Sequence, residues 1–479
     1  MSEVIGANEA IRSDGLRRAQ PSDRQVDATA IQRFLDDVEG AGLELQSLML
    51  WRDGAVVCEG FHWPYGPDRP RMSHSMTKSV TACAIGLLVD TGELALQDRV
   101  ASFFPEVAID PASPAARMTV EDLITMRTGH AEEVSGSIWR GIRTSWIAEF
   151  FNIPIVHEPG THYLYSSAAS YMLSAIVSRV TGDTIHAYLT PRLFEPLGMK
   201  QVRWDIGPDG VNPGGNGVTF LPVDSLKLGI LHAQKGVWEG RQILPRWWVE
   251  AATRAQGADD YGYHWVIGDT YFVALGQFVQ MSLVYPEYNA VLAIHSAMEE
   301  SAVLLPHLKR HFPAAFAGGS IEADRALAER LAGWPTEPAL SSAPNAEPAS
   351  LEGDWIVAAN NLGVERIGLS FAGDSVRLAL TDASGEHVLT APLDRWRTAP
   401  LTFPGASLHH GYAMAETPTV TGARWIAADR LEIALHFVES AFRDTLTIAR
   451  DGDALTLDRR VNINSAARAW PTLRGNRPV

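Results

Sequence analysis

The chain has 479 residues, of which 46% are hydrophobic, as expected of a globular protein with two or three domains. Its formal net charge of −16 argues against binding to nucleic-acid phosphates and against attraction to anionic membranes. Residues 1–25 lack the apolar stretch of a signal peptide, and no window approaches about 18 consecutive apolar residues, so we expect a cytoplasmic protein. Two cysteines, Cys58 and Cys83, cannot build a disulfide framework and are expected in the core.

The N-terminal elements are predicted from the spacing of apolar residues. Residues 1–27 are polar and are expected to form a loose arm. The pattern predicts an amphipathic helix over 28–39, and two apolar runs within 45–61 predict a β-hairpin. A helical pattern then runs over 75–88.

Further along, the predicted elements complete one domain. Helix and turn signals dominate the middle of the chain, and strand-like runs return at 270–286 and 289–297. Helical patterns follow at 303–312 and 320–333. We therefore expect a domain over 28–334.

The C-terminal part has a different composition and residue pattern. Residues 335–350 are rich in Pro, Ala and Ser and predict a linker. Residues 351–479 alternate apolar and polar positions, with a hairpin signal at Asp451-Gly452. This pattern predicts an antiparallel β-sheet or a lipocalin-like up-and-down barrel.

The most informative short stretch is SHSMTKSV, residues 73–80, in which Ser75 and Lys78 stand three positions apart. Positions i and i+3 share one face of a helix, so the two side chains can meet. Proton transfer would need lysine here, because a guanidinium keeps its proton near neutral pH whereas a desolvated ammonium can lose it. The chain has five lysines among 40 basic residues, and one of them is at this position. The residue types alone leave a catalytic pair and an ordinary serine helix cap equally open.

Four stretches in this order and spacing give a family resemblance: SMTKS, TVEDLITMRTGH, HEPGTHYLYSSAASYMLSAIVSRVTG and YLTPRLFEPLGM. Together they resemble the serine β-lactamase-related hydrolases, a family that includes class C β-lactamases, D,D-peptidases, esterases and 6-aminohexanoate-dimer hydrolases. The resemblance covers roughly residues 30–310. It implies an α/β (α+β) fold of the β-lactamase/transpeptidase type, with a mainly antiparallel central sheet, helices on both faces and an inserted helical subdomain.

The resemblance also implies roles for individual residues. Ser75 would be the nucleophile, and Lys78 would help to remove its proton. Tyr165 would move a proton between Ser75 and the leaving group, as a phenolate or through a neutral hydrogen-bonded relay. The backbone N–H groups of Ser75 and Gln277 would form the oxyanion hole.

Two departures from the family pattern bear on the substrate. Ser167 stands where the second motif usually has asparagine, and Ala274-Leu275-Gly276 stands where β-lactamases have Lys-Thr-Gly. In β-lactamases that lysine normally holds a substrate carboxylate. Because this chain lacks it, an uncharged ester or amide fits better than an anionic β-lactam. Ser167 and Gly276 are expected to border the substrate, since glycine lets a ligand approach the backbone.

Histidines offer weaker signals. His157 and His162 are the ends of HEPGTH, a stretch that superficially resembles a His-Glu-x-x-His zinc helix, but the spacing is one residue too long and Pro159 would break the helix. His409 and His410 have no third ligand nearby and are expected at the surface. We therefore expect neither a metal nor another cofactor.

Aromatic residues near the cleft regions of the family could contact a substrate. Trp139, Tyr263 and Trp265 are the candidates, although core packing explains each of them as well.

The sequence as a whole predicts a metal-independent serine hydrolase that cleaves a small ester or amide through an acyl-enzyme on Ser75. An amidase of the 6-aminohexanoate-dimer type and an acyltransferase are alternatives within this chemistry. A non-catalytic binding protein that keeps the fold is the alternative from another class, and self-association into a homo-oligomer is left open.

Overall fold

The computed structural model describes residues 11–133 and 136–478. The chain forms two compact units. The first comprises Met1–His62 and Gly66–Trp334, and the second comprises Trp63–Tyr65 and Pro335–Val479. Each unit is described by itself below.

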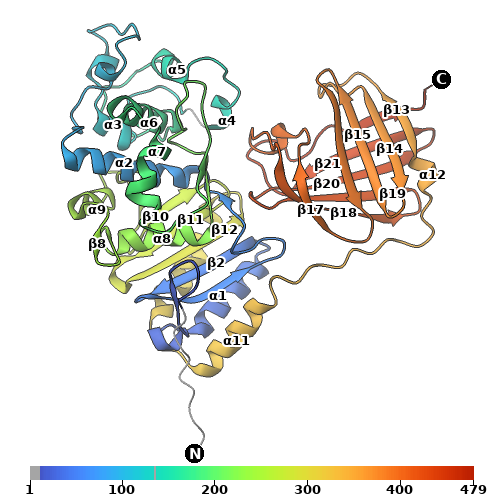
Figure 1. Ribbon diagram of the computed structural model, residues 1–479, viewed down its shortest axis with the longest axis horizontal. Helices are drawn as coiled ribbons and strands as arrows, with labels where there is room; N and C mark the ends of the chain where they lie inside the picture. The colour runs from blue at the N-terminus through green and yellow to red at the C-terminus, as the bar shows by residue number, and fades with distance from the viewer. Residues whose placement is uncertain (1–10, 134–135, 479) are drawn as a thin grey trace, which may run out of the picture. The chain divides into compact units, whose positions relative to one another are not determined.

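A seven-stranded sheet forms the centre of the first unit (Figure 1). Its neighbours pair antiparallel except at one edge, where β1 and β3 are parallel, so the predicted mainly antiparallel sheet is confirmed. The strands lie in the order β1 (Arg17–Arg18), β3 (Ala55–Phe61), β2 (Glu44–Arg52), β12 (Ala290–Ala297), β11 (Gln280–Tyr285), β10 (Phe272–Gly276) and β9 (Val266–Ile267).

The hairpin of β2 and β3 illustrates how the sequence builds this sheet. Asp53 and Gly54 connect the strands, and both have positive φ, +44° and +89°, as a tight two-residue hairpin turn requires. Along β2 the side chains alternate between two apolar clusters, because successive residues of a strand point to opposite faces. Leu48 and Leu50 belong to one cluster, whereas Met49 and Trp51 belong to the other. The sheet is therefore covered on both faces.

Helices supply these two covers. On one face lie α1 (Ala28–Gly40), α10 (Leu305–His311) and α11 (Ile321–Ala332), of which α1 and α11 lie side by side in Figure 1. On the other face, α8 (Pro222–Ala233) packs on β2, β11 and β12. Beyond α8 lies the helical subdomain: α2 (Thr77–Thr91), α3 (Val120–Ile124), α4 (Gly136–Trp139), α5 (Trp146–Asn152), α6 (Ser167–Thr181), α7 (Ile185–Leu189) and α9 (Arg246–Ala252).

Two short sheets complete the first unit. One consists of β4 (Arg71–Met72), β6 (Val218–Phe220) and β5 (Arg203–Trp204), and the other of β7 (Val237–Trp238) and β8 (Arg241–Gln242). No helix in the described part of the chain is both long enough and apolar enough to cross a bilayer.

The segment expected to be a loose arm differs from that expectation. Residues 1–10 lie outside the described part of the chain, but Arg17 and Arg18 pair with Ala55 and Val56 as the edge strand β1. The Arg18 guanidinium also bonds the Glu59 carboxylate, with Nε to Oε1 at 3.0 Å. These contacts hold the arm on the sheet.

The second unit is a ten-stranded antiparallel sheet that is nearly closed into a barrel, as predicted. Two meanders meet where β22 pairs with both β13 and β21. The strands lie in the order β16 (Gly385–Pro392), β15 (Ser375–Asp382), β14 (Arg366–Ala372), β13 (Gly353–Val357), β22 (Leu473–Asn476), β21 (Ala454–Val461), β20 (Arg443–Asp451), β19 (Arg430–Phe437), β18 (Thr417–Ala427) and β17 (Arg397–Leu401). A short helix, α12 (Pro348–Leu351), precedes β13.

The expectation that His409 is a surface residue is wrong. Its side chain is fully buried in the second unit, and its Nε2 lies 2.9 Å from an oxygen of Asp444. Arg459 is equally buried and bonds the same carboxylate through Nε at 2.8 Å. A buried charge needs a partner of opposite charge or a hydrogen bond, and the Asp444 carboxylate supplies this to Arg459 and His409 inside the sheet.

Candidate active site

Ser75 lies in a sharp turn between β4 and α2. It is the middle residue of a 3-10 turn, His74–Met76, and the α-helix itself begins at Thr77, two residues later than the sequence pattern suggested. His74 has φ of +48°, a left-handed conformation that is strained for a residue other than glycine. Ser73, just before the turn, anchors it to β6, because the Ser73 N–H donates to the Val218 carbonyl at 2.9 Å. Ser75 remains half-buried and so keeps an open side.

Lys78 points from the first turn of α2 toward Ser75. Its Nζ lies 3.1 Å from Ser75 Oγ and 3.1 Å from Ser167 Oγ, and it donates to the Gly215 carbonyl at 2.9 Å. The side chain is 1% exposed. Burial lowers the pKa of Lys78 from 10.5 to about 7, since water no longer stabilises the charged form, while Glu133 raises it in part. A lysine in this state can exchange a proton near neutral pH.

Tyr165 closes the other side of Ser75. Its hydroxyl hydrogen-bonds with Ser75, and its ring lies 4.6 Å from the Lys78 ammonium. Burial raises the pKa of Tyr165 well above 10, so the phenol is protonated near neutral pH. Of the two forms considered for this residue, the neutral hydrogen-bonded phenol is therefore the one that this environment favours.

Ser167 and Gly215 together hold the far side of the Lys78 ammonium. Ser167 is the first residue of α6, whose N-terminus is capped by Ser166 through a bond from Ala169 N–H. The loop that carries Gly215 comes from a distant part of the chain and approaches α6 closely. A Cβ built on Gly215 would lie 2.9 Å from the Ser167 carbonyl oxygen, so a side chain would push the loop away.

The role of Gly215 was missed by sequence reasoning, although a signal existed. Residues 213–217 read PGGNG, the densest glycine run in this part of the chain. Such a run permits close backbone approach, but it does not reveal which distant lysine will use a carbonyl of the loop.

The strand predicted to border the substrate does reach the nucleophile turn. Gly276 ends β10, and a Cβ built on it would lie 2.1 Å from the Ser73 carbonyl oxygen, so only glycine fits this approach. Gln277 follows directly, and the Phe278 ring packs edge-on against His74 with centroids 5.5 Å apart. The Gln277 N–H therefore belongs to the segment beside Ser75, and its part in an oxyanion hole stays a prediction.

The three aromatic candidates lie in the core of the first unit. Trp139 and Tyr263 are each 5% exposed, and Trp265 is fully buried. Trp139 packs against Trp146, Tyr263 donates its hydroxyl to Glu121, and Trp265 packs against His232. Their burial gives these side chains a packing role here, and it leaves them little surface for a substrate.

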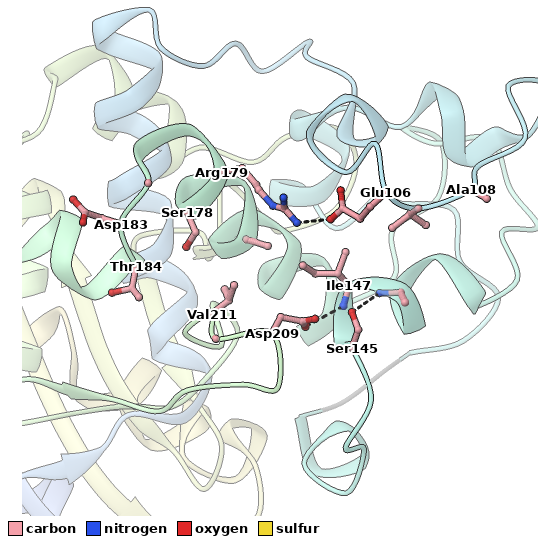
Figure 2. Close-up of a pocket in the computed structure, with 15 residues that line it drawn as sticks. Glu106, Ala108, Ser145, Ile147, Ser178, Arg179, Asp183, Thr184, Asp209 and Val211 are labelled. Carbon is pink, nitrogen blue, oxygen red and sulfur yellow. Dashed lines mark hydrogen bonds and ion pairs between the residues drawn. The ribbon is translucent and has the colours of Figure 1, made fainter.

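A separate cavity of about 690 Å³ lies in the helical subdomain, beside α5 and the C-terminal half of α6 (Figure 2). Asp209 lies on its wall and accepts hydrogen bonds from the backbone N–H of Trp146 at 2.9 Å and from the Tyr171 hydroxyl at 2.7 Å. Ser75, Lys78 and Tyr165 do not line this cavity. Through these two hydrogen bonds Asp209 ties α5 to α6.

The rings of His157 and His162 lie near each other, with centroids 4.4 Å apart. Within residues 11–133 and 136–478, however, no cluster of three or more His, Cys, Asp or Glu side chains has the geometry of a metal site.

Residues 29–310 match the family model Beta-lactamase. Protein Rv1367c of Mycobacterium tuberculosis is 28% identical over 262 residues, which cover 44% of this chain and 65% of that protein. The 6-aminohexanoate-dimer hydrolase of Paenarthrobacter ureafaciens is 24% identical over 267 residues, covering 52% of this chain and 67% of the hydrolase.

A solved structure extends the likeness over both units. SurE with D-Leu superposes with a TM-score of 0.50 at 18% identity, covering 86% of this chain and 97% of SurE. At this identity the likeness concerns the fold alone. Since the family model spans more than half of the sequence, and since Ser75, Lys78 and Tyr165 converge within its bounds, the chain belongs to the Beta-lactamase family.

Proposed function

We propose that this protein is a metal-independent serine hydrolase that cleaves a small ester or amide through an acyl-enzyme on Ser75. One observation carries the proposal: a buried lysine with a pKa of about 7 lies 3.1 Å from the serine hydroxyl. In its neutral form this amine is a general base within reach of the proton that the serine must lose.

The reaction follows from these positions. Ser75 Oγ attacks the substrate carbonyl carbon while neutral Lys78 takes the hydroxyl proton. The negative charge that develops on the carbonyl oxygen is stabilised by the backbone N–H groups of Ser75 and Gln277. Tyr165, a neutral phenol bonded to Ser75, then passes its proton to the leaving alcohol or amine as the carbonyl bond to that group breaks, and it takes back the proton held by Lys78, so that both groups are neutral again.

Water completes the cycle by the same route. A water molecule gives a proton to neutral Lys78 and attacks the acyl carbon, and Lys78 returns that proton to Ser75 Oγ as the bond between Oγ and the acyl carbon breaks. An acceptor alcohol or amine in place of water would make the same acyl-enzyme an acyltransferase. The amidase alternative differs only in the leaving group, which must be protonated more completely before it departs.

The strand beside the site supports an uncharged substrate. Ala274, at the position of the usual lysine, is fully buried, and Gly276 brings plain backbone toward the nucleophile turn. This strand position therefore offers no cation to a substrate carboxylate. An amide is supported by one similar protein, which is named a 6-aminohexanoate-dimer hydrolase.

Hydrolysis of p-nitrophenyl esters beside short oligoamides tests the proposal, with wild type compared to Ser75→Ala. We expect cleavage by wild type, with ester and amide turnover both lost in the variant. Substitution of the exposed Ser102 by alanine is the matched control and should leave the rates unchanged. Unchanged hydrolysis in Ser75→Ala would refute the mechanism, and no hydrolysis by wild type would favour the non-catalytic binding protein.

A further inference from the structure

His264 is a buried residue that the proposed reaction does not use. It lies between α9 and β9 and is 3% exposed. Its φ is +61°, a left-handed conformation that costs energy for a residue with a Cβ. A strained, buried and polar residue persists only where its surroundings hold it firmly, so its contacts are informative.

The imidazole and the backbone of His264 contact three separate elements. Its Nε2 lies 3.1 Å from Ser170 Oγ on α6, and its Nδ1 lies 3.4 Å from the Tyr261 hydroxyl. The Ile124 carbonyl at the end of α3 also accepts a hydrogen bond from the ring. The backbone carbonyl of His264 accepts a hydrogen bond from Ser79 Oγ on α2 at 2.7 Å.

Two of these partners stand next to residues of the candidate site along their helices. Ser79 directly follows Lys78 on α2. Ser170 lies three positions after Ser167 on α6, so the two share one face of the helix, and Ser167 bonds the Lys78 ammonium. His264 thus ties together the two helices whose separation sets the surroundings of that ammonium.

A further partner, Tyr261, leads to the catalytic tyrosine, Tyr165. The Tyr261 ring packs edge-on against the Tyr165 ring, with centroids 6.2 Å apart and planes at 88°. Tyr261 is 4% exposed, so it has little freedom to move unless its own contacts change. The hydroxyl of Tyr261 faces His264, and the ring of Tyr261 supports Tyr165.

We propose that His264 is a positioning residue for the serine hydrolase reaction: it fixes α2 against α6 and, through Tyr261, places the Tyr165 phenol. The role rests on the proposed function, because it concerns the groups that act on Ser75. His264 does not transfer protons itself. Burial and the nearby Lys78 charge hold the pKa of His264 well below its usual range, so the ring is neutral and serves as a fixed donor and acceptor.

Loss of this ring should loosen the packing around Lys78. Displacement of a catalytic group by about 1 Å costs up to about 100-fold in rate, with little effect on groups that only bind substrate. Water that enters the loosened site would also stabilise the charged ammonium. The kcat should therefore fall by about 10-fold to 100-fold with KM nearly unchanged, and Lys78 should titrate at higher pH.

Three variants test this role. His264→Ala removes the ring, whereas His264→Gln keeps an amide that can reach toward Ser170. Both keep a Cβ, so the cost of the left-handed backbone is similar in the two. His232→Gln is the matched control, because His232 is also 3% exposed and, among the described residues, the one hydrogen bond of its ring is that of Nδ1 with the Leu228 carbonyl at 2.8 Å within α8.

The readouts separate positioning from general stability. Ester hydrolysis gives kcat and KM, urea unfolding gives stability, and lysine labelled with ¹³C at Cε gives the titration of Lys78 directly by NMR. The chain has five lysines, so the Lys78 signal is assigned by its loss in Lys78→Met. We expect a lower kcat and a higher Lys78 pKa in His264→Ala, partial recovery of both in His264→Gln, and neither change in His232→Gln.

Two results would overturn the positioning role: an unchanged kcat and Lys78 titration in folded His264→Ala, or equal changes in His232→Gln. Failure of the proposed function would look different, because wild type would then cleave no ester. The Lys78 titration would still decide whether His264 controls the surroundings of the ammonium.

Discussion

Replacing Lys78 by methionine should strongly slow hydrolysis and should also change how stability depends on pH. The folded protein lowers the pKa of Lys78 from 10.5 to about 7, whereas the unfolded chain exposes the side chain to water and restores the higher value. Between these two pH values the unfolded state therefore binds one more proton at Lys78 than the native state does. The contribution of Lys78 to the stability of the wild type therefore rises with pH across this window and is lowest below pH 7.

The magnitude follows from the size of the shift. Each pH unit inside the window adds about 1.4 kcal/mol to the free energy of unfolding of the wild type. Between pH 6 and pH 9 only the two pH units above pH 7 contribute, so the free energy of unfolding of the wild type rises by about 3 kcal/mol. Lys78→Met lacks this gain, and below pH 7 it also avoids the burial of a charge that the wild type must bear. Loss of the general base should lower kcat/KM by about 10² to 10⁴-fold.

Urea unfolding at pH 6, 7, 8 and 9 measures the effect as the difference between wild type and variant. The two units can unfold separately, so the relevant transition is the one that the substitution shifts. Replacement of the exposed Lys309 by methionine is the control and should give a difference that does not change with pH. A constant difference for Lys78→Met as well would refute the reasoning, since it would mean that burial does not displace this titration.

The remaining predictions concern the neighbours of the site and the second unit. Tyr165→Phe should lower kcat by about 10² to 10⁴-fold while KM changes little, as steady-state kinetics will show; an equal rise in KM would mean that the phenol binds substrate instead. Gly215→Ala should lower kcat, because the new Cβ would stand 2.9 Å from the Ser167 carbonyl oxygen; unchanged rates would show that the loop can retreat without disturbing Lys78. Asp444→Asn should destabilise the second unit by about 3 to 5 kcal/mol in urea unfolding, because buried Arg459 loses its counter-charge; a loss below about 1 kcal/mol would contradict this account of the cluster.

The residue pattern predicted the parts of the fold that depend on local spacing. The helix over 28–39 corresponds to α1, Ala28–Gly40, and the hairpin within 45–61 corresponds to β2 and β3. The α-helix at the nucleophile starts at Thr77 instead of Ser75, because a 3-10 turn precedes it. Its i, i+3 contact survives nevertheless, since the 3-10 turn also brings residues three apart onto one side.

The surroundings of Lys78 could not be predicted in this way. The carbonyl that accepts a hydrogen bond from the Lys78 ammonium belongs to Gly215, which is 137 positions away in the chain. The shift in the pKa of Lys78 depends on burial, and the residue pattern of α2 alone does not predict that burial. Trp265 and His409 show the same limit, because a neighbouring motif or a polar side chain does not reveal whether tertiary packing will bury a residue.

The central claim is that Ser75 is an activated nucleophile, and intact-mass spectrometry after incubation with a serine-reactive phosphonate tests it most directly. The account predicts one covalent adduct on the wild type, formed faster as pH rises through about 7 and absent from Ser75→Ala. An adduct of equal yield on Ser75→Ala, or none on the wild type, would contradict it.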